Sequence, residues 1–208
     1  IWETALGKDH PNVAKGLQNL AQLLQARGKL DEAEPLLRRA LTIWKTALAK
    51  HHPEVEKGLN NLALWLRELG KLEDAEPLFR HALKLTEASL GKDHPNVPAA
   101  LNNLGELLVA RGKLDDAEPL LRRALVLTET NLGKGHLDVA TVLNNLAGLL
   151  DARGKQDEAR RLLGRTLAIW EGALGRDHPY VAAGLSNLAG IELNQSQFER
   201  ALSLSRRA

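Results

Sequence analysis

The sequence predicts an all-α fold, a solenoid of stacked antiparallel helical hairpins, and three observations predict it. The 208-residue chain repeats every 42 residues, so that residues 7–48 and 91–132 are identical at 29 of 42 positions. Within each repeat, apolar residues recur at the three- and four-residue spacing of one helix face. Glycine follows most of these apolar runs, where a left-handed cap can end a helix.

Four residue types mark the frame of the repeat, each recurring at intervals of 42 residues. They are His10, His52, His94, His136 and His178; Asn19, Asn61, Asn103, Asn145 and Asn187; Gly28, Gly70, Gly112 and Gly154, with Ser196 in the fifth slot; and Ala33, Ala75, Ala117, Ala159 and Ala201. Two apolar runs per repeat predict two helices per repeat.

The first helix of each repeat is predicted to begin near the sequence HPNV. Pro11 fits the first helical position, where its missing N–H costs nothing. Gly28 follows the last periodic residue and suits the left-handed conformation of a helix cap. One helical face between them carries the apolar residues Val13, Leu17, Leu20, Ala21 and Leu24.

The second helix is predicted to begin at Asp31, because Asp31 and Glu34 have the spacing of a capping box. Pro35 falls near its fourth position, where a proline removes one early hydrogen bond and leaves the helix intact; Pro77 and Pro119 are its equivalents. The apolar stripe of this helix is Ala33, Leu36, Leu37, Ala40, Leu41, Trp44 and Leu48. Second helices are predicted to end at Gly7, Gly91, Gly133 and Gly175, with Ala49 in the remaining slot.

Small residues are predicted where the paired helices meet. Larger side chains there would overpack the contact, at roughly 1–3 kcal/mol each. One hairpin cannot bury its stripe alone, so neighbouring hairpins must stack. The small positions are Ala or Gly at 21, 63, 105, 147 and 189, and Ala at 33, 75, 117, 159 and 201.

Tryptophan is expected to contribute unevenly to this core. Trp65 should pack between helices, because Leu or Ile fills its slot in the other repeats. Trp44 and Trp170 end second helices, as does Trp2, in slots where Thr86 and Thr128 also occur. We therefore expect these three tryptophans to be partly dispensable.

These motifs resemble the tetratricopeptide repeat. The resemblance is carried by the phrases LNNLA, ARGKLDEAEPLLRRAL and LGKDHP and by Leu17, Leu20, Ala21, Leu24, Gly28, Ala33, Leu37 and Ala40. The usual tetratricopeptide unit has 34 residues, and the 42-residue unit is similar to the variety found in kinesin light chains and many bacterial proteins. The resemblance covers the whole chain and implies a right-handed superhelical solenoid, here from a bacterial protein.

The repeat frame also predicts the domain organisation. A single solenoid is expected over residues 1–208, made of the end of a preceding second helix at 1–6, full repeats at 7–48, 49–90, 91–132 and 133–174, and a truncated repeat at 175–208. Because the chain opens without Met, we expect an excised fragment. No polar capping helix is predicted at either end, so the uncapped terminal helices are expected to support end-to-end self-association.

The composition excludes several kinds of partner. With 28 basic and 26 acidic residues, the formal net charge of +2 provides no bulk attraction to nucleic acid. The absence of Cys excludes disulfides, zinc–thiolate sites and thiol catalysis. No apolar run approaches the roughly 18–20 residues of a membrane span. We expect no nucleic-acid partner, no membrane partner and no cofactor, and a cytoplasmic location.

The stretch GKDHPNV, at residues 7–13 and 91–97, combines Lys, Asp and His and invites a catalytic or metal-binding interpretation. Helices in neighbouring repeats should lie roughly 10 Å apart, whereas metal–nitrogen bonds are about 2 Å, so the five repeated histidines cannot share one ion. The stretch also lacks the glycine spacing of a phosphate loop. We interpret it as a joint in which the histidine caps or packs at the helix entry, and we expect no metal site and no enzyme activity.

Basic pairs recur on the second helices, at Arg38-Arg39, Arg80-His81, Arg122-Arg123 and Arg206-Arg207. Glutamates lie four residues before three of these pairs, at Glu34, Glu76 and Glu118, which is the spacing of an ion pair on one helix face. A solvated, self-neutralised face is therefore predicted in preference to a surface for nucleic acid or anionic lipid.

The resemblance implies that the first helices line a concave groove. The groove positions are then Lys15, Gln18, Asn19, Gln22 and Gln25; Lys57, Asn60, Asn61, Leu64 and Arg67; Ala99, Asn102, Asn103, Glu106 and Val109; Thr141, Asn144, Asn145, Gly148 and Asp151; and Ala183, Ser186, Asn187, Gly190 and Leu193. Basic residues fall in the first half and acidic residues in the second, so an extended peptide is expected to place its acidic end at the first two repeats.

The asparagine present in every repeat has two interpretations. A primary amide offers two donors and an acceptor, which suits a peptide backbone. Alternatively, this asparagine bonds only to the adjoining repeat. The leading function is a non-catalytic scaffold that binds a protein or peptide ligand in the groove. The alternatives are an architectural or self-associating spacer, favoured by the scarcity of groove aromatics, and a regulatory array attached to a catalytic or signalling domain elsewhere.

Overall fold

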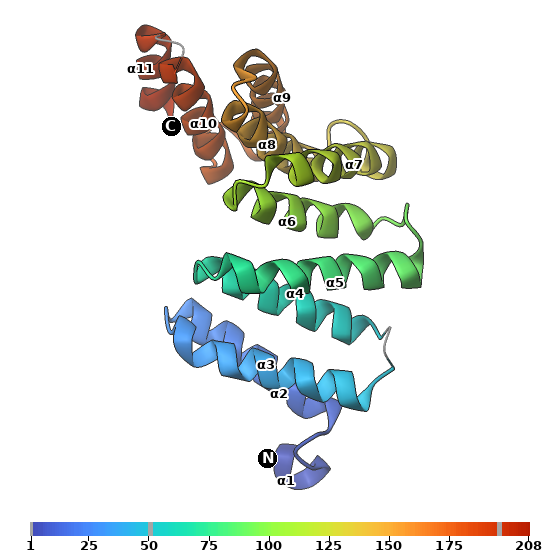
Figure 1. The fold of residues 1–208 in the computed structure, drawn as a ribbon. Helices are drawn as coiled ribbons and strands as arrows, with labels where there is room; N and C mark the ends of the chain where they lie inside the picture. The colour runs from blue at the N-terminus through green and yellow to red at the C-terminus, as the bar shows by residue number, and fades with distance from the viewer. Residues whose placement is uncertain (1, 50–51, 195–196) are drawn as a thin grey trace. The chain divides into compact units, whose positions relative to one another are not determined.

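The computed structural model describes residues 2–49, 52–194 and 197–208, and every element in them is a helix. The chain forms two compact units, residues 1–100 and 101–208, which are described separately (Figure 1). The helix α6, Val97–Ala110, spans the boundary between them. Ser196, in the fifth turn-glycine slot, lies outside the described residues.

The first unit contains two complete helical hairpins. Its helices are α1 (Trp2–Leu6), α2 (Pro11–Ala26), α3 (Leu30–Ala47), α4 (Pro53–Glu68) and α5 (Leu72–Leu90). The helix α2 pairs with α3 and α4 pairs with α5, while α3 also packs on α4 and joins the two hairpins (Figure 1).

The second unit repeats the same arrangement. After the C-terminal part of α6 come α7 (Leu114–Leu132), α8 (Leu137–Ala152), α9 (Gln156–Leu174), α10 (Pro179–Asn194) and α11 (Phe198–Arg207). The helix α8 pairs with α9 and α10 with α11, while α7 packs on α8 and α9 on α10. The predicted all-α fold of stacked helical hairpins is confirmed.

The repeated histidine caps the first helix of every repeat. His10 has an extended backbone, with ψ of 138°, and its Nδ1 accepts a hydrogen bond from the N–H of Asn12 at 3.1 Å. This bond satisfies one of the amide groups that a helix leaves free in its first turn. The interpretation of this histidine as a cap is confirmed, and the same bond recurs at His52, His94, His136 and His178 at 3.1–3.2 Å.

The helix α6 begins two residues later than its counterparts because of Pro98. Proline has no N–H, so it cannot form the first helical bond, which would run to the carbonyl of His94. The cap itself remains, since the N–H of Asn96 donates to His94 Nδ1 at 3.2 Å.

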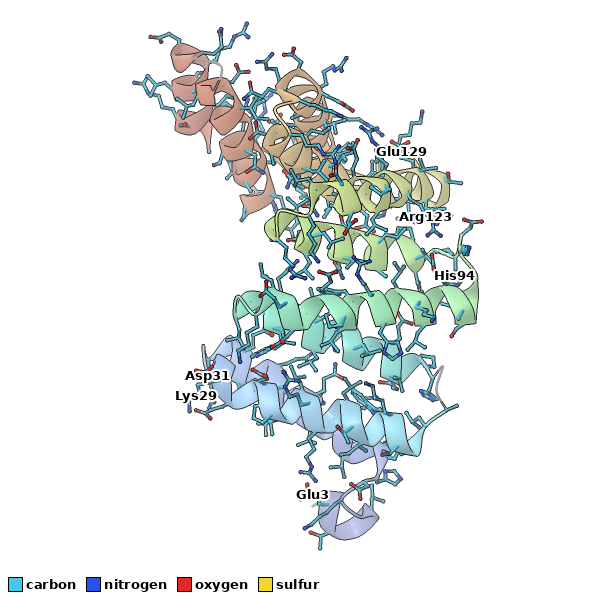
Figure 2. The ribbon with its side chains drawn as sticks, viewed as in Figure 1. Glu3, Lys29, Asp31, His94, Arg123 and Glu129 are labelled. Carbon is cyan, nitrogen blue, oxygen red and sulfur yellow. The ribbon has the colours of Figure 1, made fainter. Side chains whose placement is uncertain are left out.

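The turn between α2 and α3 is too short for the predicted capping box. Gly28, with φ of +71°, donates to the carbonyl of Gln25, and Lys29 donates to the carbonyl of Leu24, which together form a Schellman cap. Lys29 is also the residue that precedes α3, and no side chain caps that helix. The prediction that α3 begins at Asp31 with a capping box is wrong, because Asp31 already lies in the first turn (Figure 2).

Alanine and glycine occupy the contacts between paired helices, as predicted. Ala21, Ala33 and Ala159 are fully buried. A Cβ built on Gly105 would lie 2.7 Å from Leu121 Cγ, so α6 and α7 approach each other too closely for a side chain. Pro35, Pro77 and Pro119 lie inside α3, α5 and α7, which continue past them as predicted.

Two tryptophans are matched by glycines on the following helix. Trp44 is only 2% exposed, and a Cβ on Gly58 would lie 2.8 Å from its ring. Trp170 is 4% exposed, and a Cβ on Gly184 would lie 3.2 Å from its ring and 2.9 Å from Leu167 Cδ2. The expectation that these tryptophans are partly dispensable is wrong for both, because each fills space that the facing glycine leaves open. Trp65 is buried as expected.

Ion pairs connect successive hairpins in addition to the predicted pairs along one helix. Arg38 pairs with Glu34, Arg80 with Glu76, and Arg122 with Glu118, each at 2.8 Å. Glu34 also receives Lys71 from the next hairpin, at 2.7 Å, and Glu118 receives Arg153 from the next hairpin. The hydrogen bond from Arg122 lowers the pKa of Glu118 below its usual 4.5, and that from Lys71 lowers the pKa of Glu34.

Replacing His136 tests the histidine cap. His136→Ala should lower the free energy of unfolding by about 0.5–2 kcal/mol, because the Asp138 amide loses its acceptor. His136→Asp should restore most of that loss, since a carboxylate accepts the same bond. Chemical denaturation checks both variants, and equal stability of His136→Ala and wild type would contradict the cap.

A double-mutant cycle tests the match between Trp44 and Gly58. Gly58→Ala should destabilise the wild type by about 1–3 kcal/mol through overpacking. In a Trp44→Thr background, Gly58→Ala should be neutral or stabilising. The indole ring that the new Cβ would meet is absent there, and alanine favours a helix by about 1 kcal/mol over glycine. Denaturant titration gives the coupling energy. An equal effect in both backgrounds would show that the ring and the glycine are independent.

The lowered pKa of Glu118 predicts a pH-dependent contribution to stability. Its charged form is favoured in the folded protein, so the contribution is complete above about pH 4.5 and is lost as pH falls through the folded pKa. Glu118→Gln should therefore cost roughly 0.5–1.5 kcal/mol at pH 7 and less at pH 3. Urea titrations at both pH values measure this difference. Glu199→Gln, on an exposed position of α11, is the matched control for the substitution itself.

Candidate functional site

The first helices of each unit border one recess. In the first unit, a cavity of about 250 Å³ lies between α2 and α4, and it is called the first recess. Its lining is Gln18, Ala21, Gln22, Gln25, Leu37, Asn61, Leu64, Trp65 and Glu68.

In the second unit, a cavity of about 340 Å³ lies between α8 and α10, and it is called the second recess. Residues of α6 and α9 complete its walls. Its lining is Glu106, Val109, Asn144, Asn145, Ala147, Gly148, Asp151, Leu163, Ser186, Asn187, Gly190 and Ile191.

The recesses bring together part of the predicted groove. Gln18, Gln22 and Asn61 line the first recess, and Glu106, Asn144, Asn145 and Asn187 line the second. The other candidates lie outside both recesses: Lys15, Asn19 and Lys57 are exposed, Asn102 is buried, and Asn60, Arg67 and Asn103 are partly buried. Lys57 Nζ lies 3.8 Å from Glu54 Oε1 on the same helix, α4.

The repeated asparagines form side-chain bonds between successive first helices in the second unit. Asn145 Nδ2 donates to Asn102 Oδ1 at 3.0 Å, and Asn187 Nδ2 donates to Asn144 Oδ1 at 2.9 Å. Each bond joins one repeat to the preceding one, as the second interpretation of this asparagine requires. A primary amide carries two N–H donors and one oxygen, so each bond leaves the donating asparagine a further N–H and its oxygen for another partner.

The two recesses differ in how their carboxylates are satisfied. In the first recess, Gln25 Nε2 donates to Glu68 Oε2 at 2.7 Å, so the carboxylate already has a donor from the neighbouring helix. In the second recess, Asp151 Oδ1 is enclosed by protein atoms and has no hydrogen-bond partner. Burial of such an oxygen without a donor is unfavourable. The second recess therefore holds a carboxylate that the protein leaves uncompensated.

The charges of the recesses agree with only half of the predicted asymmetry. Glu106 and Asp151 line the second recess, where acidic residues were predicted. No Lys or Arg is among the described residues that line the first recess, whereas Glu68 is. The basic residues Lys15, Lys57 and Arg67 thus do not contribute to that recess.

Residues outside the predicted slots complete both walls. Trp65 and Glu68 belong to the first recess, and Leu163 and Ile191 to the second. Leu163 comes from a second helix, and a pattern that assigns the groove to the first helices alone cannot find it. Trp65 and Ile191 are apolar, and their periodicity predicts core positions.

The part of the chain that the structure describes contains no group of three His, Asp or Glu side chains placed to hold a metal ion. Within that part, no helix combines the length and apolar character needed to cross a bilayer.

Comparison with family models gives one description over most of the chain, the tetratricopeptide repeat. Matches cover residues 13–54, 54–130, 98–171 and 138–208. No relative was found among the curated proteins.

Several solved structures share the fold. Nearly identical TPR-like repeats assigned to a kinesin light chain of Podospora anserina are 25% identical, with 95% of this chain and 94% of that chain covered and a TM-score of 0.78. BtubC (BKLC) from P. vanneervenii is 26% identical, with coverage of 95% and 78% and a TM-score of 0.78. MamA from Desulfovibrio magneticus RS-1, at 17% identity, coverage of 92% and 90% and a TM-score of 0.63, shares the fold alone.

Proposed function

This chain belongs to the tetratricopeptide repeat family, and from that premise we propose that it is a non-catalytic scaffold that binds an extended protein segment along its first helices. Tetratricopeptide repeats generally mediate protein–protein interactions and are typically not catalytic. Kinesin-light-chain-like arrays are its structural neighbours. The proposal adds the binding surface, which comprises the first and second recesses.

The observation that carries this proposal is the set of amide side chains on the first helices. Asn145 and Asn187 each retain an N–H and an oxygen after bonding to the preceding repeat. An extended peptide presents alternating N–H and C=O groups at about 3.3 Å per residue. Primary amides about 10 Å apart, the spacing of packed helices, would meet it at every third residue.

Self-association is a second candidate, supported by the first hairpin. Leu20 and Leu23 on α2 are 45% and 50% exposed, whereas Leu62, in the slot of Leu20 one repeat later, is 2% exposed. The open face of α2 could receive the end of another copy. Such a contact would make the chain a self-associating spacer.

Selection from a library of random 12-residue peptides displayed on phage tests peptide binding. The wild type should enrich peptides, and these should bind Ser186→Trp and Gln22→Trp at least about tenfold more weakly, because each bulky ring fills one recess. Ala168→Trp, on an exposed position of α9, is the matched control and should retain the wild-type affinity.

Failure to enrich any peptide, or equal binding by all three variants, would contradict the proposal. Sedimentation velocity on the same samples separates the second candidate. A mass that rises with concentration in the wild type and not in Leu20→Gln would support self-association.

A further inference from the structure

The second recess contains space for one side chain of a ligand. A Cβ built on Gly148 or on Gly190 would meet nothing within 4 Å. Other repeats fill this slot with Gln22, Leu64 and Glu106. Two consecutive first helices therefore leave open the positions that side chains occupy in the other repeats.

Asp151, in the last turn of α8, also lines this recess. The C-terminus of a helix carries a partial negative charge, so a carboxylate there is unfavourable and strengthens the negative potential. The equivalent slots hold Gln25, Arg67, Val109 and Leu193. Asp151 is the one residue in this slot whose charge has the same sign as the helix end, and its Oδ1 has no donor within the protein.

The remaining walls suit a long side chain with a polar head. Val109, Leu163 and Ile191 provide apolar surface, against which an aliphatic stem can pack. A second carboxylate, Glu106, lies on the same lining, and no Lys or Arg is among the described lining residues. A cation beside a carboxylate and between apolar walls is held more strongly than one in open water.

We propose that the second recess binds one arginine or lysine side chain of the partner segment, with its cationic head at Asp151 and its stem between Gly148 and Gly190. This inference rests on the proposed peptide-binding function and specifies its chemistry: the segment carries a basic residue where it crosses α8 and α10. The first recess does not share the property, because Gln25 already satisfies Glu68.

A small probe tests the recess without requiring a peptide. N-acetyl-arginine amide is titrated into the ¹⁵N-labelled chain, and N-acetyl-citrulline amide, which has nearly the same shape and no charge, is the control. The backbone amide signals of Gly148, Asp151 and Gly190 should shift with the arginine probe, with a Kd in the range of about 1 mM expected for one side chain. Citrulline should leave them unchanged.

Variants identify the group responsible. Asp151→Asn, which preserves the shape, should weaken arginine binding at least about tenfold, and Gly148→Gln, which places the residue of repeat one in the slot, should do the same. Asp177→Asn removes the same charge from an exposed loop and should bind as the wild type does. Because Asp151 opposes the dipole of α8, Asp151→Asn should unfold at the same or a higher temperature than the wild type. Absent shifts, equal shifts with citrulline, or undiminished binding by Asp151→Asn would each overturn the inference.

Peptides enriched by the display experiment separate this inference from the proposed function. Replacing their arginines with citrulline and their lysines with glutamine should reduce binding to the wild type and leave binding to Asp151→Asn unchanged. Peptides that bind equally well after these replacements would leave the scaffold function standing and overturn the cationic recess. Arginine-probe binding without any enriched peptide would support the recess and contradict the extended-peptide function.

Discussion

The structure depends on one constraint, which is that no hairpin can bury its apolar stripe without a neighbour. The slot of Leu20 shows this most directly. Leu62, in that slot one repeat later, is buried where α3 packs on its helix, whereas Leu20 is largely exposed. Stacking in turn requires that each turn between helices set the direction of the next helix in the same way. The histidine caps and the glycine turns serve this requirement, and the bonds that they form recur with nearly constant lengths.

The regularity that stacking requires is also what made the fold predictable. Periodicity, glycine and proline located the helices to within a residue or two, and the i, i+4 glutamates identified real ion pairs. The prediction of a capping box at Asp31 was wrong because it used the spacing of Asp31 and Glu34 and not the length of the turn. A single residue, Lys29, both closes α2 and precedes α3, which leaves no position for a side-chain cap. The cap at His10 could be suggested from its position, but its acceptor atom required coordinates.

The candidate site was less predictable than the fold. Family resemblance selected most of the residues that line the second recess, because first-helix slots follow the repeat. The space itself arises because Gly148 and Gly190 have no side chain. A search for polar or charged side chains in the repeat gives little weight to a glycine. Two polar residues of this recess also differ in their hydrogen bonding. Asn145 donates a hydrogen bond to Asn102, whereas Asp151 Oδ1 accepts none. Residue identity alone cannot separate an engaged polar group from an uncompensated one.

The match between tryptophan and glycine has a consequence for how such an array can grow or be rebuilt. A repeat whose second helix ends in Trp44 or Trp170 is followed by one with glycine at the facing position, Gly58 or Gly184. Where the second helix ends in threonine, the following repeat carries Ala100 or Val142 instead. The repeats are therefore not freely interchangeable modules, although their sequences are close. An array with shuffled or duplicated repeats keeps a well-packed core only when each tryptophan and the glycine that faces it are moved together.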